Sequence, residues 1–285
     1  MSVELIQEPV ALETPTVPES DIFPPTDLIY DDGEPLESNR HRIAMNVLID
    51  GMYQAYQHRD DYFVGGNMFV YYSRRQIKNQ DFRGPDFFAV LNVDGKRERR
   101  YWAVWDEDGR YPDVIVELLS DSTAKEDIGP KKVIYEQTFR TPEYFVYDPF
   151  NPESLRGWHL GTNLRYSPLS TDERGWLWCE TLGLWLGTWQ GMINRETATW
   201  LRFYDSEGEL VLLPKELAVL ERERAEAESQ RAEAERERAE AESQRAEAER
   251  QQKEEAEAIL EAERQKNQAL RERLQALGID PDSIS

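Results

Sequence analysis

The chain has 285 residues, of which 39% are hydrophobic and 11% aromatic, enough for one or two domains with a buried core. Its 34 basic and 56 acidic side chains give a net charge of -22, which argues against a general nucleic-acid coat, because phosphate binding needs a positive surface. The single cysteine, Cys179, excludes a disulfide framework and favours a reducing compartment such as the cytoplasm. No signal-peptide pattern opens the chain and no run approaches 18 apolar residues, so we expect neither secretion nor a membrane span.

The first segment, residues 1–37, holds ten acids, six prolines and no base. We interpret it as an acidic, proline-rich leader. Residues 38–100 hold eleven bases against seven acids, so the objection to nucleic-acid binding applies to the whole chain more than to this stretch.

The middle of the chain, residues 38–213, has the mixed periodicity of an α/β domain. Ser38 can cap a helix that extends to Tyr56, because the apolar residues after it recur at helical spacing. A second helix is predicted around residues 130–139, and the Trp-rich stretch 156–213 predicts hairpins. Strands are predicted within residues 62–73, 85–91, 101–105, 113–119 and 144–148.

Residues 214–285 are predicted to form one long helix or coiled coil. The 14-residue block at 221–234 recurs letter for letter at 235–248, and it places Arg and Glu three and four residues apart. The heptad seam carries Ala and Arg instead of large apolar residues, so a weak coiled coil and a lone exposed helix both remain open. A cluster near the end, Leu270, Leu274 and Leu277, can bind a partner helix or a second copy of the chain.

Three carboxylates belong to predicted strands. Glu117 lies inside the apolar run 113–119, where a carboxylate is costly unless something compensates it. Asp113 shares its face because strands have period two, and Asp86 opens the neighbouring strand. Such a group can hold a hard divalent cation. The alternative is that Asp86 and Asp113 are turn residues and that Glu117 pairs with an arginine.

Four ordered motifs carry a resemblance to a known family: GPDFFAV at 84–90, YPDVIVELLS at 111–120, DIGPKKVIYEQ at 127–137 and TPEYFVYDP at 141–149. They resemble the restriction endonucleases of the Uma2 family, a branch of the PD-(D/E)xK nuclease superfamily. The resemblance covers about residues 27–213. It implies a restriction-endonuclease-like core with a central mixed sheet flanked by helices, a Mg²⁺ or Mn²⁺ cofactor, and hydrolysis of DNA phosphodiester bonds.

The resemblance also implies roles for individual residues. Asp86 and Glu117 match the acidic pair of the motif as metal ligands, with Asp113 as a third ligand or a neighbour of the ligands. The superfamily usually has a lysine two residues after the second acid, but this chain has Leu119 there, so the lysine must come from another position. Lys131, one helical turn before Tyr135, matches the Uma2 lysine, and Lys132 is the fallback. Glu37 is a weak match to a first-helix glutamate.

We therefore expect a metal-dependent endonuclease that acts on DNA. The alternative is a catalytically decayed nuclease fold that binds partners or acts as a scaffold through its helical tail. One further feature stays open: Lys96, Arg97, Arg99 and Arg100 form either a phosphate-gripping hairpin or a solvated tip. His41 is interpreted as a capping or packing residue.

Overall fold

The computed structural model describes residues 28, 38–73 and 82–278. The chain divides into two compact units, Met1–Glu216 and Leu217–Ser285. The sequence-based leader, residues 1–37, lies outside the described residues apart from Leu28, and so does the candidate Glu37. The division into segments 1–37, 38–213 and 214–285 stays a prediction.

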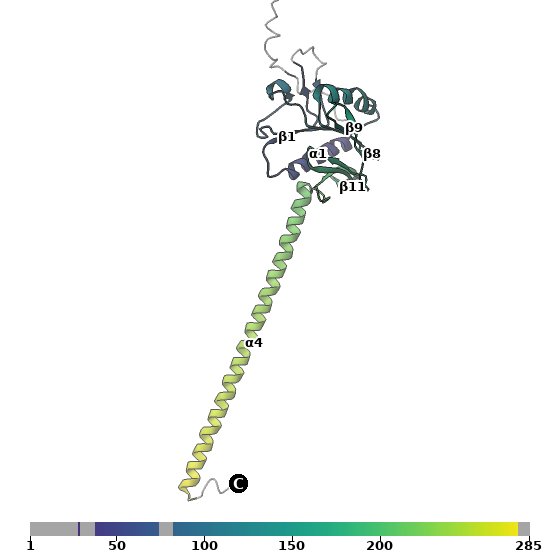
Figure 1. Ribbon diagram of the computed structural model, residues 1–285. Helices are drawn as coiled ribbons and strands as arrows, with labels where there is room; N and C mark the ends of the chain where they lie inside the picture. Colours follow the sequence, from purple (N-terminus) through teal and green to yellow (C-terminus); the bar gives the residue numbers. More distant parts are fainter. Residues whose placement is uncertain (1–27, 29–37, 74–81, 279–285) are drawn as a thin grey trace, which may run out of the picture. The chain divides into compact units, whose positions relative to one another are not determined.

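The centre of the first unit is a six-stranded mixed sheet (Figure 1). Strands β6 and β7 are parallel, and every other pair in this sheet is antiparallel. All five residues of β6 are buried, as expected for a strand covered on both faces. In spatial order the strands are β1 (Tyr62–Gly65), β4 (Phe87–Leu91), β6 (Val114–Leu118), β7 (Glu143–Asp148), β8 (Asn151–Leu160) and β9 (Tyr166–Pro168). The predicted fold class, an α/β core with a central mixed sheet, is confirmed.

One face of this sheet packs against helix α1 (Asn39–Ala55) and a second, three-stranded sheet. Ser38 caps α1 as predicted, because its side chain accepts a hydrogen bond from the His41 amide. Alternate residues of β6, Val114, Val116 and Leu118, point into this core. The second sheet consists of β10 (Leu177–Cys179), β11 (Leu184–Ile193) and β12 (Glu196–Tyr204).

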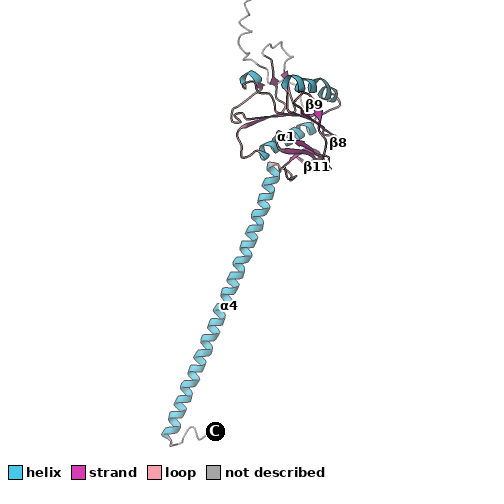
Figure 2. Cartoon of the chain, in the orientation of Figure 1, coloured by secondary structure: helices cyan, strands magenta, loops and turns pink. Residues whose placement is uncertain are grey.

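The opposite face packs against a helical run that extends from residue 124 to residue 139, longer than the predicted 130–139 (Figure 2). Two of its four segments have wide π-helical turns, and Pro130 lies inside the first of them. Proline has no N–H to donate, so the usual hydrogen bond to the preceding turn is missing there. The segments are α2 (Ala124–Glu126), η3 (Asp127–Lys131), α3 (Lys132–Ile134) and η4 (Tyr135–Phe139).

A small sheet and a short 3₁₀ turn complete the first unit. The predicted strand at 62–73 is interrupted, because Asn67 has a φ of 46°, outside the strand region. The buried Leu28 packs on this sheet beside Phe69 and Tyr71. Its strands are β2 (Val70–Tyr71), β3 (Phe82–Arg83) and β5 (Trp102–Ala103), followed by η2 (Val104–Asp106).

Helix α4 (Pro214–Ala276) has 63 residues, and from Leu217 onward it supplies nearly all of the described part of the second unit. None of its residues is buried. Arg222 pairs with Glu226 and Arg250 with Glu254, each four residues on. Over the described part of the chain, no helix is both long enough and apolar enough to cross a membrane.

Candidate active site

Two carboxylates meet where β4 begins and β6 ends. The antiparallel register pairs Phe87 with Val116, which brings Asp86 beside Glu117. The Asp86 amide donates to Oε2 of Glu117 at 3.3 Å, and the Leu118 amide donates to Oδ2 of Asp86 at 2.7 Å. Both side chains therefore belong to one short stretch at the end of the central sheet.

Glu117 is fully buried on the face that packs against the helical run. Its Oε1 accepts a hydrogen bond from the Tyr135 hydroxyl at 2.7 Å and lies 3.4 Å from Nζ of Lys131. The cost of burying this carboxylate is therefore offset by a hydroxyl donor and a cation. The cation is a lysine and not the arginine of the alternative interpretation.

The two neighbouring lysines point in different directions. Lys131 turns inward toward Glu117, and its side chain is 17% exposed. Lys132 instead places Nζ over the ring of Trp158, 4.1 Å from its centroid. Successive helix residues diverge by about 100°, so only one of them can face the sheet. Lys131 is the one of the two whose ammonium group lies near Glu117.

Asp127 is a fourth member of the site. Its Oδ1 lies 2.8 Å from Nζ of Lys131, closer than Glu117, and the residue is 1% exposed. The sequence analysis did not single out Asp127, although its spacing of four residues before Lys131 is a signal for an ion pair on a helix.

The carboxylates repel one another electrostatically. Burial, and then the charge of Glu117, raise the pKa of Asp86 well above its usual value. The same two causes raise the pKa of Asp127 to about 6. Burial opposes the charge on Lys131, but Glu117, Asp127 and Asp86 together hold its pKa above the ordinary range, so Lys131 stays protonated.

Asp113 does not join this group, so the expectation that it shares a site with Glu117 is not met. Both residues point to the same face of β6, but they are four residues apart, about 13 Å along a strand. Oδ2 of Asp113 instead accepts the Leu91 amide at 2.7 Å and lies 3.5 Å from Nη2 of Arg110. Sharing a face does not bring residues together when they lie at opposite ends of a strand.

The remaining pair fits a hard divalent cation. Mg²⁺ is commonly held by one or two carboxylates plus water and substrate phosphate. Asp86 and Glu117 supply two such carboxylates, whose mutual repulsion a cation would relieve. Within the described ranges no group of three or more His, Cys, Asp or Glu side chains has the geometry to hold a metal ion, so the pair would need ligands from water or substrate.

The basic residues at 96–100 lie in the loop between β4 and β5, which belong to different sheets, so they do not form the expected hairpin. Their side chains are already paired within the protein. The side chain of Arg99 is 3% exposed and donates two hydrogen bonds to Glu107, of 2.8 and 3.0 Å. Lys96 contacts Asp60 at 2.7 Å, and Arg97 donates to the carbonyl of Asp106. These contacts favour a solvated tip over a phosphate grip.

His41 joins helix α1 to the end of β6. Its Nδ1 lies 2.8 Å from Oγ of Ser38, and its Nε2 lies 3.0 Å from the carbonyl oxygen of Leu119. These contacts agree with the interpretation of His41 as a capping and packing residue.

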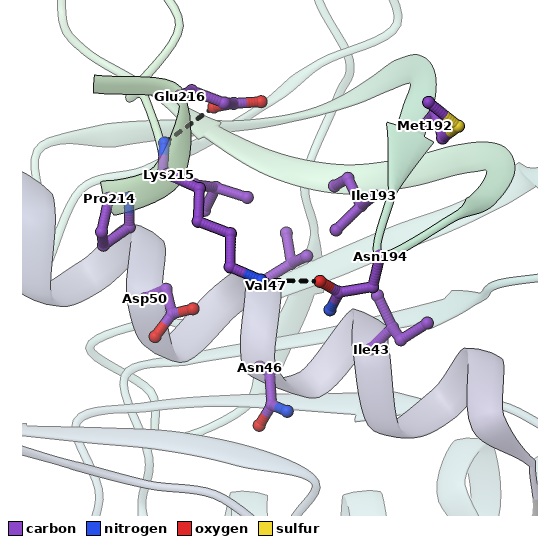
Figure 3. Close-up of a pocket in the computed structure, with 11 residues that line it drawn as sticks. Ile43, Asn46, Val47, Asp50, Met192, Ile193, Asn194, Pro214, Lys215 and Glu216 are labelled. Carbon is purple, nitrogen blue, oxygen red and sulfur yellow. Dashed lines mark hydrogen bonds between the residues drawn. The ribbon is translucent and has the colours of Figure 1, made fainter. Parts of the chain in front are cut away.

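A separate cavity of about 340 Å³ lies on the α1 side of the first unit (Figure 3). It is lined by α1, by the turn between β11 and β12, and by residues 213–216. Across it, Nζ of Lys215 donates to Oδ1 of Asn194 at 3.0 Å. None of the carboxylates described above lines this cavity.

A family model matches residues 21–190, more than half of the chain, and its description is Uma2, "Putative restriction endonuclease". The chain belongs to the Uma2 family. This match spans the strand ends that carry Asp86 and Glu117 and the helical run that carries Lys131. The family resemblance stated from the sequence motifs is confirmed.

A solved structure, described as that of "a putative nuclease belonging to DUF820" from Anabaena variabilis ATCC 29413, is also similar to this Uma2 chain. It is 10% identical, with a TM-score of 0.38, and the similarity covers 54% of this chain and 81% of that one. No curated protein matched the sequence.

Proposed function

We propose that this Uma2 protein is a divalent-metal-dependent endonuclease that hydrolyses phosphodiester bonds of DNA. The observation that carries the proposal is the convergence of Asp86, Glu117 and Lys131 at one sheet end. Two carboxylates and one ammonium group are the residue types that metal-assisted phosphoryl chemistry uses.

Asp86 and Glu117 would hold Mg²⁺ or Mn²⁺. When bound, such an ion polarises the phosphoryl oxygen and makes water more acidic. Glu117 is kept in place by the Tyr135 hydroxyl and by the amide of Asp86. Asp86 would be the second ligand, and its Oδ2 is held in place by the Leu118 amide.

Lys131 would act as a fixed positive charge. Its Nζ lies 2.8 Å from the Asp127 carboxylate, and this ion pair favours the charged ammonium form over a neutral base. Its ammonium group would instead bind a phosphate oxygen and stabilise the negative charge that develops during attack. The ion pair with Asp127 favours this electrostatic role over activation of water as a base.

The test is cleavage by the full chain. Duplex and single-stranded DNA would be incubated with Mg²⁺ or Mn²⁺, with and without excess EDTA. We expect products only with metal, and none from Glu117→Gln. The absence of cleavage from every DNA form in both metals, with metal binding intact, would contradict the proposal.

The second candidate is a non-catalytic Uma2 fold that binds partners. Its main argument was the missing lysine at Leu119, and the approach of Lys131 to Glu117 weakens that argument. Failure to bind Mn²⁺ would favour this candidate over the nuclease.

We further propose that the C-terminal end of α4, together with Leu277 just after it, docks another protein or a second copy of the chain through Leu270, Leu274 and Leu277. Leu270 and Leu277 are 50% and 70% exposed, whereas the repeat contributes only Ala among apolar residues.

We also propose a cytoplasmic location, because the described cysteine, Cys179, is a free, buried thiol.

A further inference from the structure

We propose that Asp127 is a positioning residue, whose carboxylate fixes the ammonium group of Lys131 at the place where it faces Glu117. This inference rests on the proposed nuclease function of the site. It adds a role for a residue that need not touch the metal or the DNA.

The distances rank the partners of Lys131. Nζ lies 2.8 Å from Oδ1 of Asp127 and 3.4 Å from Oε1 of Glu117. Asp127 is 1% exposed, so the closer contact is screened little by solvent. Asp127 is therefore the nearer partner of the ammonium group, and the longer distance leaves Glu117 able to bind a second cation.

The main chain of Asp127 is fixed from the central sheet. The Tyr144 hydroxyl, on β7, donates to the carbonyl oxygen of Asp127 at 2.9 Å. Tyr144 is fully buried, and its ring stacks on Trp158 at a centroid distance of 5.7 Å. A rigid strand residue thus holds the helical turn that carries Asp127.

Lys131 needs such a partner because its side chain is long and flexible. It follows Pro130 in a wide helical turn, and it is partly exposed, so the ammonium group has an alternative position in solvent. The ion pair with Asp127, four residues earlier, holds the ammonium group inside the site instead of in solvent.

A different role for Asp127 would be metal ligation, and the two roles predict different results. A ligand is needed for metal affinity, whereas a positioning residue acts on Lys131. Asp127→Asn removes the charge and keeps the shape. Glu126→Gln is the matched control, because Glu126 is the adjacent residue and is exposed.

The first readout needs neither metal nor DNA. Lysine methylation of the full chain, followed by mass spectrometry, measures how accessible Nζ of Lys131 is. We expect faster labelling of Lys131 in Asp127→Asn, wild-type labelling in Glu126→Gln, and restored protection in Asp127→Glu. Unchanged labelling of Lys131 in Asp127→Asn would overturn the proposal.

The second readout is kinetic. We expect Asp127→Asn to lower kcat about 10- to 100-fold, the range typical when a supporting partner is lost. The KM for DNA and the Mn²⁺ affinity by calorimetry should change by less than about threefold. A loss of Mn²⁺ affinity that parallels the loss of kcat would make Asp127 a ligand and overturn the positioning role.

Tyr144→Phe keeps the test decisive if Asp127→Asn does not fold. It deletes one hydroxyl that holds the Asp127 main chain, and we expect Lys131 to label faster. Protection equal to wild type would count against the proposal. If the wild-type protein cleaves no DNA, the labelling result still decides the role of Asp127, so failure of the two proposals can be told apart.

Discussion

Asp86 and Glu117 each accept a hydrogen bond from the main chain of the other's strand. The Asp86 amide donates to the Glu117 carboxylate, and the Leu118 amide donates to the Asp86 carboxylate. These two bonds fix the start of β4 against the end of β6. They do not neutralise the two negative charges, and Lys131 supplies one positive charge to three carboxylates. This excess of negative charge is the physical basis of the proposed metal-binding site.

Replacing either carboxylate should abolish metal-dependent cleavage. Glu117→Gln and Asp86→Asn each remove one negative ligand, while the amide oxygen that replaces the Glu117 carboxylate can still accept the Tyr135 hydroxyl. Because the carboxylates repel each other, the metal-free variants should unfold at or above the wild-type temperature. Calorimetry and thermal unfolding measure both effects, and undiminished Mn²⁺ binding by either variant would disprove its role as a ligand.

Lys131→Met should remove activity by several orders of magnitude and retain metal binding. It should also destabilise the metal-free protein, because Asp127 and Glu117 lose their cation. Lys132→Met is the matched control. It loses only a contact with Trp158 and should slow cleavage less than about tenfold, equivalent to ~1.4 kcal/mol. Equal losses in the two variants would show that the geometry does not select Lys131.

Asp113→Asn should leave catalysis almost unchanged, because Asp113 lies at the far end of β6. The asparagine oxygen can still accept the Leu91 amide, so the free energy of unfolding should change by less than about 1 kcal/mol. Metal affinity and kcat should stay within about threefold of wild type. A tenfold loss of metal affinity would return Asp113 to the ligand set.

Glu216 should stabilise the first unit in a pH-dependent manner. Its carboxylate accepts two hydrogen bonds from the buried Arg202, of 2.7 and 3.1 Å. Burial opposes the charge, but Arg202 and the Leu213 amide lower the pKa of Glu216 below its ordinary value of 4.5. Glu216→Gln should therefore cost about 2 to 3 kcal/mol at neutral pH.

The direction of the pH dependence follows from the lowered pKa. The stabilisation by Glu216 is present above pH 4.5 and is lost as the pH falls through the lower pKa of the folded state. Denaturant unfolding of wild type and Glu216→Gln should give curves that converge in acid. A difference that grows as the pH falls would contradict this assignment.

Two truncations separate the tail from its first turn. Removing residues 217–285 keeps the ion pair between Glu216 and Arg202, so the first unit should keep its unfolding temperature and metal affinity. Removing residues 215–285 leaves the buried Arg202 without its carboxylate and should lower the unfolding temperature. Sedimentation of the full chain and the first truncation tests self-association, and a monomer in both would remove the case for pairing through α4.

The amino-acid sequence determined the parts of this protein that depend on local pattern. The apolar runs around Val114 and Phe145 predicted buried strands, because few other structures bury consecutive β-branched and aromatic residues. The exact repeat predicted the long helix, because its Arg and Glu spacing is helical. The motifs around Asp86 and Glu117 predicted the family and the acidic pair.

Tertiary structure decided which of the candidate residues meet. Period two placed Asp113 and Glu117 on one face of β6. Only the antiparallel register between β4 and β6 showed that Asp86 lies beside Glu117. Asp113 lies at the other end of the strand, where it binds the Leu91 amide. Asp127 could not be chosen from sequence, because its burial depends on how the helical run packs over the sheet. Periodicity specifies the face of an element, whereas distances along and between elements are set by strand register and packing.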